Sequence, residues 1–200
     1  VNRQLVGVLA DLHFAPTKNA ASHLLSEGKY SESVVVTGNT AIDAMKYTVD
    51  DNYKSNIMDK YHDKKFILMT AHRRENIGKP MENIFKAVRR LIDEYTDLAL
   101  VYPMHKNPKV REVAQKILGS HDRIELIEPL DVVDFHNFAK KSYFILTDSG
   151  GIQEEAPSFN KPVLVLRSVT ERPEGVEAGT LKVIGTNKQN VYQAAKELID

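Results

Sequence analysis

The sequence contains no cysteine in its 200 residues. This absence excludes disulfide bonds and thiolate sites, and it is compatible with the reducing cytoplasm that we expect as the location. No apolar run approaches the roughly 18 residues that a membrane helix requires, and no signal peptide opens the chain. The charge is balanced, with 27 basic and 27 acidic residues. We therefore expect neither a membrane nor a nucleic acid as a partner.

The first part of the chain differs from the rest. It begins Val1-Asn2-Arg3 without a methionine, so we expect either a processed start or a piece of a longer protein. A strand is predicted over residues 9–14 and a helix over 19–27, and this pair has no partners of its own with which to bury a core. We therefore expect residues 1–30 to be the tail of a preceding domain and residues 31–200 to form a second one.

Beyond about residue 30, short apolar runs alternate with amphipathic stretches. The runs predict strands at residues 34–36, 65–69, 98–102, 124–127, 143–146, 163–166 and 181–184. Helical spacing and end signals predict helices at residues 39–49, 81–95, 107–119, 132–140, 152–158 and 189–199. Such alternation is typical of an α/β fold with a parallel sheet and helices on both faces.

Polar clusters follow four of the predicted strands. They are TAHRREN after Met69, PMHKNP after Tyr102, TDSGG after Leu146 and RSVTERPE after Leu166. The carboxyl ends of parallel strands meet at one edge of a sheet, where ligands bind. We therefore expect one site built from four separate segments.

The segment TDSGGIQEE, residues 147–155, predicts a nucleotide-sugar site. Two adjacent glycines let backbone N–H groups approach a ligand, and a helix beginning near Ile152 would favour a diphosphate. Either Glu154 or Glu155 can then accept from a ribose diol, while the other meets solvent or an arginine. An ordinary tight turn remains the alternative. Ser149 is not a hydrolase nucleophile, because Thr147 stands where a nucleophile elbow needs glycine.

Three further side chains are candidates at the same edge. His72 can donate to a phosphate or exchange a proton, and the arginines after it can hold a phosphate; the alternative is a surface loop with an internal Arg–Glu pair. Arg172 lies in a loop suited to closing over a ligand, unless that loop is merely solvated. His105 is either functional or structural. The remaining histidines lack metal-ligand spacing, so we expect no metal site.

Taken together, the motifs resemble those of the bacterial non-hydrolysing UDP-N-acetylglucosamine 2-epimerases. The matching segments are ADLHFAPT (10–17), VTGNTAIDA (36–44), TAHRREN (70–76), VYPMHKNP (101–108), TDSGGIQEEAPSFNKPVLVLR (147–167) and TERPEGVEAGT (170–180). The resemblance covers essentially the whole chain. It implies a Rossmann-like sheet forming the C-terminal, UDP-binding half of a GT-B two-domain architecture, with the final helices truncated after residue 200 and residues 1–30 as the tail of the N-terminal Rossmann-like domain.

The resemblance also implies roles for individual residues. His72 is the catalytic candidate, at the sugar–diphosphate. Arg73 and His105 match positions implicated in binding a second, activating UDP-N-acetylglucosamine. The substrate-binding candidates are Leu130 and Phe135 at the uracil, Ser149, Gly150 and Gly151 at the diphosphate, Glu155 at the ribose and Arg172 at the sugar–diphosphate.

The implied reaction interconverts UDP-N-acetylglucosamine and UDP-N-acetylmannosamine, supplying N-acetylmannosamine units for cell-surface polysaccharides. A base removes the proton at carbon 2 while UDP leaves carbon 1, and UDP then returns to 2-acetamidoglucal, so no cofactor is expected. The family's proton-transfer carboxylates lie in the N-terminal domain. We therefore expect these 200 residues alone to bind UDP weakly and not to epimerise, and the full-length protein to be a homodimer.

Three alternatives remain open. A GT-B glycosyltransferase shares the glycine turn and the ribose carboxylate but passes the sugar to an acceptor. A hydrolysing epimerase releases free UDP. A non-catalytic UDP-sugar-binding module would bind the ligand without exchanging the proton at carbon 2.

Overall fold

A computed structural model of the chain describes residues 2–200, which divide into two compact units. The first is Val1–Lys46 and the second is Tyr47–Asp200. The helix α3 (Thr40–Thr48) runs across the boundary between them. No helix within residues 2–200 combines the length and the apolar character that crossing a bilayer would need.

The first unit contains a small parallel sheet. Its elements are α1 (Asn2–Leu9), β1 (His13–Ala15), α2 (Lys18–Ser26), η1 (Ser31–Ser33) and β2 (Val34–Val36). Strand β1 pairs with β2 in register, His13 opposite Val34. The expectation that the first strand and helix have no partners is therefore wrong: residues 34–36, beyond the expected boundary at residue 30, supply a second strand. Where the domains of a longer protein divide stays a prediction.

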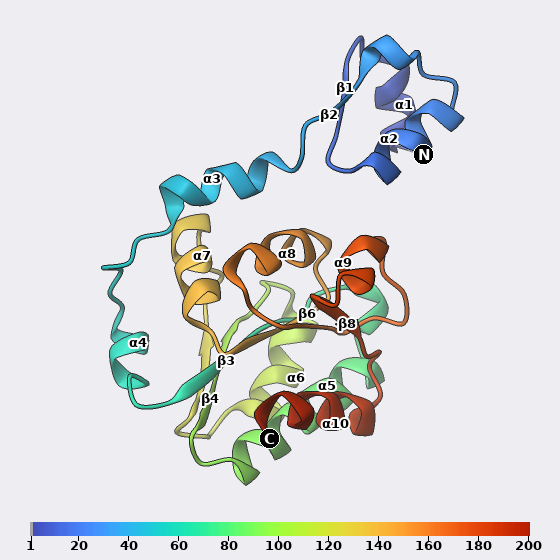
Figure 1. The fold of residues 1–200 in the computed structure, drawn as a ribbon. Helices are drawn as coiled ribbons and strands as arrows, with labels where there is room; N and C mark the ends of the chain where they lie inside the picture. Colours follow the sequence, from blue (N-terminus) through green and yellow to red (C-terminus); the bar gives the residue numbers. More distant parts are fainter. Residues whose placement is uncertain (1) are drawn as a thin grey trace. The chain divides into compact units, whose positions relative to one another are not determined.

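The second unit is a six-stranded sheet in which every strand is parallel, as the sequence predicted (Figure 1). The strand order is β5-β4-β3-β6-β7-β8. The strands are β3 (Lys65–Thr70), β4 (Leu98–Pro103), β5 (Ile124–Ile127), β6 (Phe144–Thr147), β7 (Val163–Val165) and β8 (Leu181–Val183). The helices are α4 (Asn56–Lys60), η2 (Arg74–Asn76), α5 (Lys79–Glu94), α6 (Pro108–Leu118), α7 (Val132–Lys141), α8 (Gly150–Glu155), η3 (Ala156–Phe159), α9 (Pro173–Glu177) and α10 (Lys188–Ile199).

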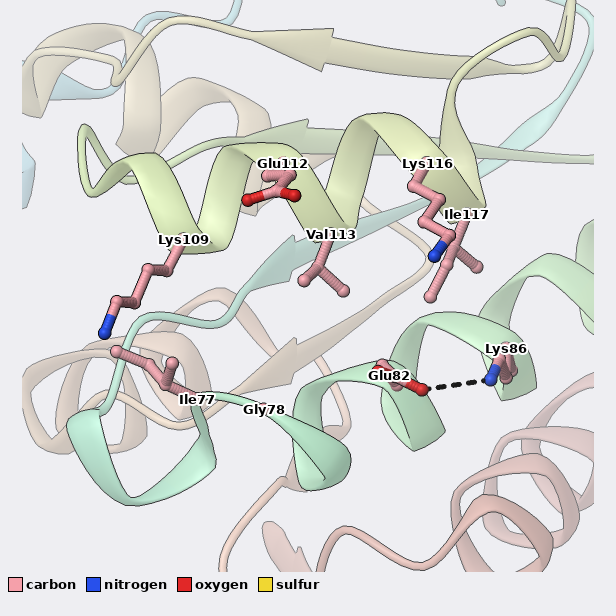
Figure 2. A pocket seen from close by; sticks show the side chains of 9 residues that line it. All are labelled: Ile77, Gly78, Glu82, Lys86, Lys109, Glu112, Val113, Lys116 and Ile117. Atoms are coloured by element: carbon pink, nitrogen blue, oxygen red, sulfur yellow. Dashed lines mark hydrogen bonds and ion pairs between the residues drawn. The ribbon is translucent and has the colours of Figure 1, made fainter.

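Helices cover both faces of this sheet. In Figure 1, α5, α6 and α10 lie on one face and α7 and α8 on the other. Between α5 and α6 lies a cavity of about 340 Å³ (Figure 2). Its lining is a mixture of apolar and charged side chains: Ile77, Gly78, Glu82, Lys86, Lys109, Glu112, Val113, Lys116 and Ile117.

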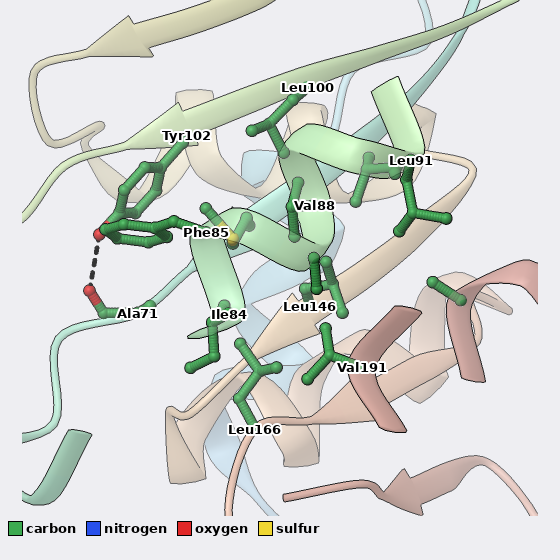
Figure 3. Close-up of a cluster of buried hydrophobic side chains, with 14 of the residues drawn as sticks. Ala71, Ile84, Phe85, Val88, Leu91, Leu100, Tyr102, Leu146, Leu166 and Val191 are labelled. Atoms are coloured by element: carbon green, nitrogen blue, oxygen red, sulfur yellow. Dashed lines mark hydrogen bonds between the residues drawn. The ribbon is translucent and has the colours of Figure 1, made fainter. Parts of the chain in front are cut away.

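Alternation along the strands divides the core into two layers. On β3, Ile67 and Met69 belong to the layer under α5, whereas Phe66 and Leu68 belong to the opposite layer. Figure 3 shows part of the first layer, where helix α5 buries its apolar stripe against the sheet. The Tyr102 hydroxyl donates to the carbonyl oxygen of Ala71 at 2.7 Å, so this core also anchors the chain just after β3.

The strand order places a switch point between β3 and β6. From β3 the chain proceeds outward through β4 and β5, whereas from β6 it proceeds to the other side through β7 and β8. The connections leaving β3 and β6 therefore diverge and open a crevice at the carboxyl edge, which is where ligands bind in such sheets. Thr70 and Thr147 face each other there, with their hydroxyl oxygens 2.7 Å apart.

Candidate functional site

Asp148 organises the switch point. Its side chain is fully buried directly after β6. One carboxylate oxygen, Oδ2, accepts from the backbone N–H groups of His72 and Arg73 and from the side-chain amide of Asn76, each at 2.9 Å. The loop after β3 is therefore wrapped around a carboxylate that comes from the neighbouring strand.

His72 is held by its edge and by its face. Its Nδ1 lies 3.3 Å from Oδ1 of Asp148. Its ring stacks on that of His105, with centroids 5.6 Å apart and an interplanar angle of 13°. The structure therefore joins the loops after β3 and β4 through two histidines that were separate candidates in the sequence. The side chain of His72 is 37% exposed, so part of it is accessible to a ligand.

Two arginines converge on Gly150. A β-carbon built on this glycine would lie 3.4 Å from Nη2 of Arg172 and 3.6 Å from Nη2 of Arg73. Arg73 also donates from Nε to the backbone carbonyl of Asp148, at 3.1 Å. A side chain at this position would therefore be in van der Waals contact with both guanidinium groups, and the glycine leaves that space open.

The helix that follows begins earlier than the predicted residue 152, at Gly150, with Ser149 as its N-cap. The Ser149 side chain makes no capping hydrogen bond. Its backbone N–H donates to the hydroxyl of Thr147 at 2.9 Å, and its carbonyl accepts from the side-chain amide of Gln153 at 2.9 Å. The backbone of the glycine turn is thus fixed from both sides.

The two glutamates of this helix point to different partners. Glu154 accepts from Nε of Arg172, so the expectation that one carboxylate meets an arginine is confirmed. Glu155 instead lies 3.5 Å from Nε2 of the buried His136. His136 follows Phe135 on α7, and Phe135 and Leu130 both pack against the core layer on this side of the sheet. The ribose candidate Glu155 therefore contacts the residue that follows the uracil candidate Phe135 in the chain.

A second set of ion pairs ties the loop after β3 to the loop after β7. Buried Arg167 donates from Nε to Glu75 at 3.0 Å and from Nη2 to Glu171 at 3.2 Å. The hydrogen bond from Arg167 lowers the pKa of the Glu171 carboxyl, and the positive charges of Arg172 and Arg73 act in the same direction. Because Glu75 pairs with Arg167, the alternative of an Arg–Glu pair internal to the HRREN loop does not hold.

The cavity between α5 and α6 is a separate feature. Figure 2 shows lysines, glutamates and aliphatic side chains around it, and it contains none of the residues singled out in the sequence. Among residues 2–200, no group of three or more histidine, aspartate or glutamate side chains is placed to hold a metal ion.

The sequence did not single out Asp148, Asn76, His136 or Arg167. Each carries a polar side chain that the fold buries and that contacts a predicted site residue or its loop. Asp148, Asn76 and Arg167 stand within the clusters TDSGG, TAHRREN and RSVTERPE, but nothing in those clusters indicates which side chain is buried. The partners of all four residues come from segments far apart in the chain.

Comparison with known proteins agrees with this geometry. The family model described as UDP-N-acetylglucosamine 2-epimerase matches residues 1–200. The chain is 62% identical over 199 residues to the UDP-N-acetylglucosamine 2-epimerase of Bacillus subtilis, matching 100% of this chain and 52% of that protein. It is 43% identical over 207 residues to the Escherichia coli enzyme of the same name, covering 99% of this chain and 55% of that one. The chain thus spans about half the length of these relatives.

Solved structures give the same result. A crystal structure of a putative UDP-N-acetylglucosamine 2-epimerase from Listeria monocytogenes superposes with a TM-score of 0.93 at 61% identity, over 100% of this chain and 54% of that one. The Neisseria meningitidis enzyme bound to UDP-GlcNAc superposes with a TM-score of 0.90 at 45% identity, over 99% and 56%. The expected fold class, a Rossmann-like parallel sheet from a GT-B architecture, is confirmed. The chain belongs to the UDP-N-acetylglucosamine 2-epimerase family.

Proposed function

We propose that this chain is the UDP-binding part of an enzyme that interconverts UDP-N-acetylglucosamine and UDP-N-acetylmannosamine for cell-surface polysaccharide synthesis. One observation carries the proposal: His72, Arg73 and Arg172 lie in the loops around buried Gly150, at the switch point of the sheet. Three cationic or proton-donating groups around a glycine suit a diphosphate. The relatives' names, and the Neisseria structure with UDP-GlcNAc bound, support the same ligand.

In this proposal the glycine turn receives the diphosphate. The backbone of Ser149, Gly150 and Gly151 approaches the phosphate oxygens, and Arg172 holds them with its planar fork. Arg172 already forms ion pairs with Glu154 and Glu171. A bound phosphate therefore either shares the guanidinium group with these carboxylates or displaces them from it. The serine hydroxyl, which caps no helix, is a further phosphate contact.

The uridine lies toward α7. Glu155 accepts hydrogen bonds from the ribose diol, because a carboxylate offers acceptors to two adjacent hydroxyls. Phe135 and, beside it, Leu130 contact the uracil. The position of Glu155 next to His136, the residue after Phe135, supports a ribose site and a base site that adjoin one another.

The reaction proceeds by elimination and return. A base takes the proton from carbon 2, the new double bond forms between carbons 1 and 2, and the electrons of the carbon 1–oxygen bond leave with the phosphate of UDP. Reprotonation of 2-acetamidoglucal on the other face and return of UDP give the epimer. His72 stabilises the charge that develops on the departing phosphate, as a positioned hydrogen-bond donor can.

The groups that move the carbon 2 proton belong, in this proposal, to an N-terminal domain of which the first unit is the tail. Two observations support this. The relatives are about twice as long as this chain. The first unit also exposes large apolar side chains, Leu5, Val6, Val8, Leu9 and Phe14 among them, as expected of a sheet and helices that pack against further chain. The 200 residues alone should then bind UDP weakly and not epimerise.

We further propose a cytoplasmic homodimer for the full-length enzyme, with no cofactor. A second UDP-N-acetylglucosamine would bind beside the first through Arg73 and His105. The stacking of His105 on His72 supports this arrangement, because the candidate for the second ligand then adjoins the candidate for the substrate.

Incubating the full-length protein with UDP-N-acetylglucosamine in deuterated water tests the reaction. Deuterium at carbon 2 together with UDP-N-acetylmannosamine is the expected result. Accumulation of free UDP and N-acetylmannosamine would favour a hydrolysing epimerase, and transfer of the sugar to an acceptor would favour a glycosyltransferase. Ligand binding without any exchange would contradict catalysis and leave a binding module.

A further inference from the structure

Within residues 2–200, the buried carboxylate of Asp148 forms no ion pair with a lysine or arginine, although Nε of Arg73 donates to the backbone carbonyl of the same residue. Its side chain is 0% exposed. Within residues 2–200, the one ionisable side chain in an ion pair with this carboxylate is His72, whose Nδ1 lies 3.3 Å from Oδ1. Burial raises the pKa of the Tyr102 hydroxyl, and the negative charge of Asp148 raises this pKa further. A buried carboxylate needs hydrogen-bond donors on both oxygens.

The contact between Oδ1 of Asp148 and the ring of His72 favours a proton on Nδ1. Oδ2 is occupied by three N–H groups, from the backbone of His72 and Arg73 and the side chain of Asn76. Oδ1 receives the backbone N–H of His72 at 3.1 Å and faces the ring nitrogen Nδ1. An ionised carboxylate only accepts hydrogen bonds, so a hydrogen on Nδ1 makes the 3.3 Å contact with Oδ1 attractive, whereas a lone pair on Nδ1 would be repelled. The other ring nitrogen, Nε2, then points away from Asp148.

The stacked ring of His105 has the opposite tautomer when it is neutral. Its Nδ1 accepts from the backbone N–H of Asn107 at 3.1 Å, so the proton of neutral His105 is on Nε2. Protonating Nδ1 of His105 would break that bond. Of the two histidines, His72 is therefore the one placed to carry a charge, with the carboxylate beside it.

We propose that Asp148 is a positioning residue for His72. It selects the Nδ1–H tautomer and fixes the ring so that Nε2 is presented to the ligand. When His72 is protonated, Asp148 stabilises the imidazolium, and Nε2–H donates to an anion. That this anion is the diphosphate of a nucleotide sugar rests on the proposed function; the tautomer does not. The logic is that of a buried aspartate behind a functional histidine.

The tautomer can be read directly. In the 15N-labelled 200-residue protein, long-range 1H–15N NMR spectra recorded well above the usual imidazole pKa of about 6.5 distinguish Nδ1–H from Nε2–H. The expected result is Nδ1–H at His72 and Nε2–H at His105. Nε2–H at His72 in the unsubstituted protein overturns the proposal, and this outcome needs no variant to fold.

The substitution Asp148→Asn should change the tautomer of His72. The side-chain oxygen of the asparagine is needed where three donors meet, so its NH2 group takes the place of Oδ1 and faces Nδ1 of His72. The backbone N–H of His72 gives up its 3.1 Å bond to Oδ1 and keeps its 2.9 Å bond to the oxygen. Nδ1 must then accept, and His72 changes to Nε2–H. Asp93→Asn is the matched control, because Asp93 also lies 3.3 Å from a histidine nitrogen, Nε2 of His121, but is half exposed. It should leave the His72 signals unchanged.

Binding of UDP gives the second readout. Asp148→Asn should raise the Kd for UDP about tenfold, because His72 then donates from a neutral ring instead of from an imidazolium that Asp148 stabilises, whereas Asp93→Asn should not change it. An unchanged His72 tautomer, or unchanged UDP affinity in a folded Asp148→Asn protein, contradicts the positioning role. If the tautomers are as proposed but the unsubstituted protein binds no UDP, the proposed function fails while the role of Asp148 in holding His72 stands.

Discussion

Gly150 lies against the guanidinium group of Arg172: a β-carbon on this glycine would stand 3.4 Å from Nη2. Gly150 is not among the glycines with positive φ, so alanine is compatible with its backbone. Backbone conformation therefore does not require glycine at this position, whereas a β-carbon there would touch the guanidinium groups of both arginines.

Gly150→Ala should separate binding from stability. Alanine is the better helix residue by roughly 0.5–1 kcal/mol, so the unfolding free energy should stay equal or rise. The new methyl group occupies space between the arginines and the phosphates, so the Kd for UDP should increase about tenfold. Gly7→Ala is the matched control, since its β-carbon would lie 3.4 Å from Cε of Lys29, also the end of a flexible side chain. Calorimetry showing equal UDP affinity for both variants would contradict the prediction.

Substitution of Glu155, but not of Glu154, should change the preference of the protein for a ribose over a 2′-deoxyribose. If Glu155 accepts from the diol, the unsubstituted protein should prefer UDP over 2′-deoxy-UDP by roughly tenfold, and Glu155→Gln should lose most of that preference. Glu154→Gln should keep it, because Glu154 is engaged with Arg172. The ratio of the two dissociation constants is the measurement, and loss of the preference in Glu154→Gln instead would reverse the assignment.

Tyr102→Phe should destabilise the fold by about 1–3 kcal/mol, because it leaves the buried carbonyl of Ala71 without its donor. Urea unfolding measures this, with an unchanged slope expected. The comparison is Tyr143→Phe. The hydroxyl of Tyr143 also donates to a backbone carbonyl, that of Leu198 near the end of the chain, at 2.9 Å, but this hydrogen bond is only half-buried. A cost in Tyr143→Phe as large as in Tyr102→Phe would mean that burial is not the cause.

The large sheet was predictable because each of its strands is an apolar run bounded by polar turns. The run at residues 34–36 has the same appearance, yet it pairs with β1. Three valines indicate a strand but carry no information about its partner. Helices α4 and α9, of five residues each, were missed because they are too short to show helical periodicity.

The site was predictable in its segments but not in its support. His72, Gly150 and Arg172 stand in segments that follow predicted strands, and the strand order brings those segments together. Asp148 was overlooked because nothing in a run of small polar residues indicates which of them is buried. His136 was set aside as a histidine without metal spacing, although the fold places it between Glu155 and the hydroxyl of Thr48, the latter 2.7 Å from Nδ1.

His121 should make the fold sensitive to mild acid. Burial lowers its pKa below the usual value of about 6.5, and the positive charges of Arg89 and Arg123 act in the same direction against a smaller opposing effect of Asp93. Its Nδ1 also accepts from the backbone N–H of Arg123 at 3.0 Å, a bond that protonation of Nδ1 would break. Because the folded state favours the neutral ring, its contribution to stability is complete above about pH 6.5 and is lost as the pH falls below that value.

Urea unfolding at about pH 7.5 and about pH 5.5 would test this, with His121→Gln measured beside the unsubstituted chain. The other histidines are present in both proteins, so their contributions cancel in the comparison. The unsubstituted chain should lose more stability between the two pH values than the variant does. A pH dependence equally steep in His121→Gln would assign the acid sensitivity to other groups, and a less steep one in the unsubstituted chain would reverse the sign derived for this residue.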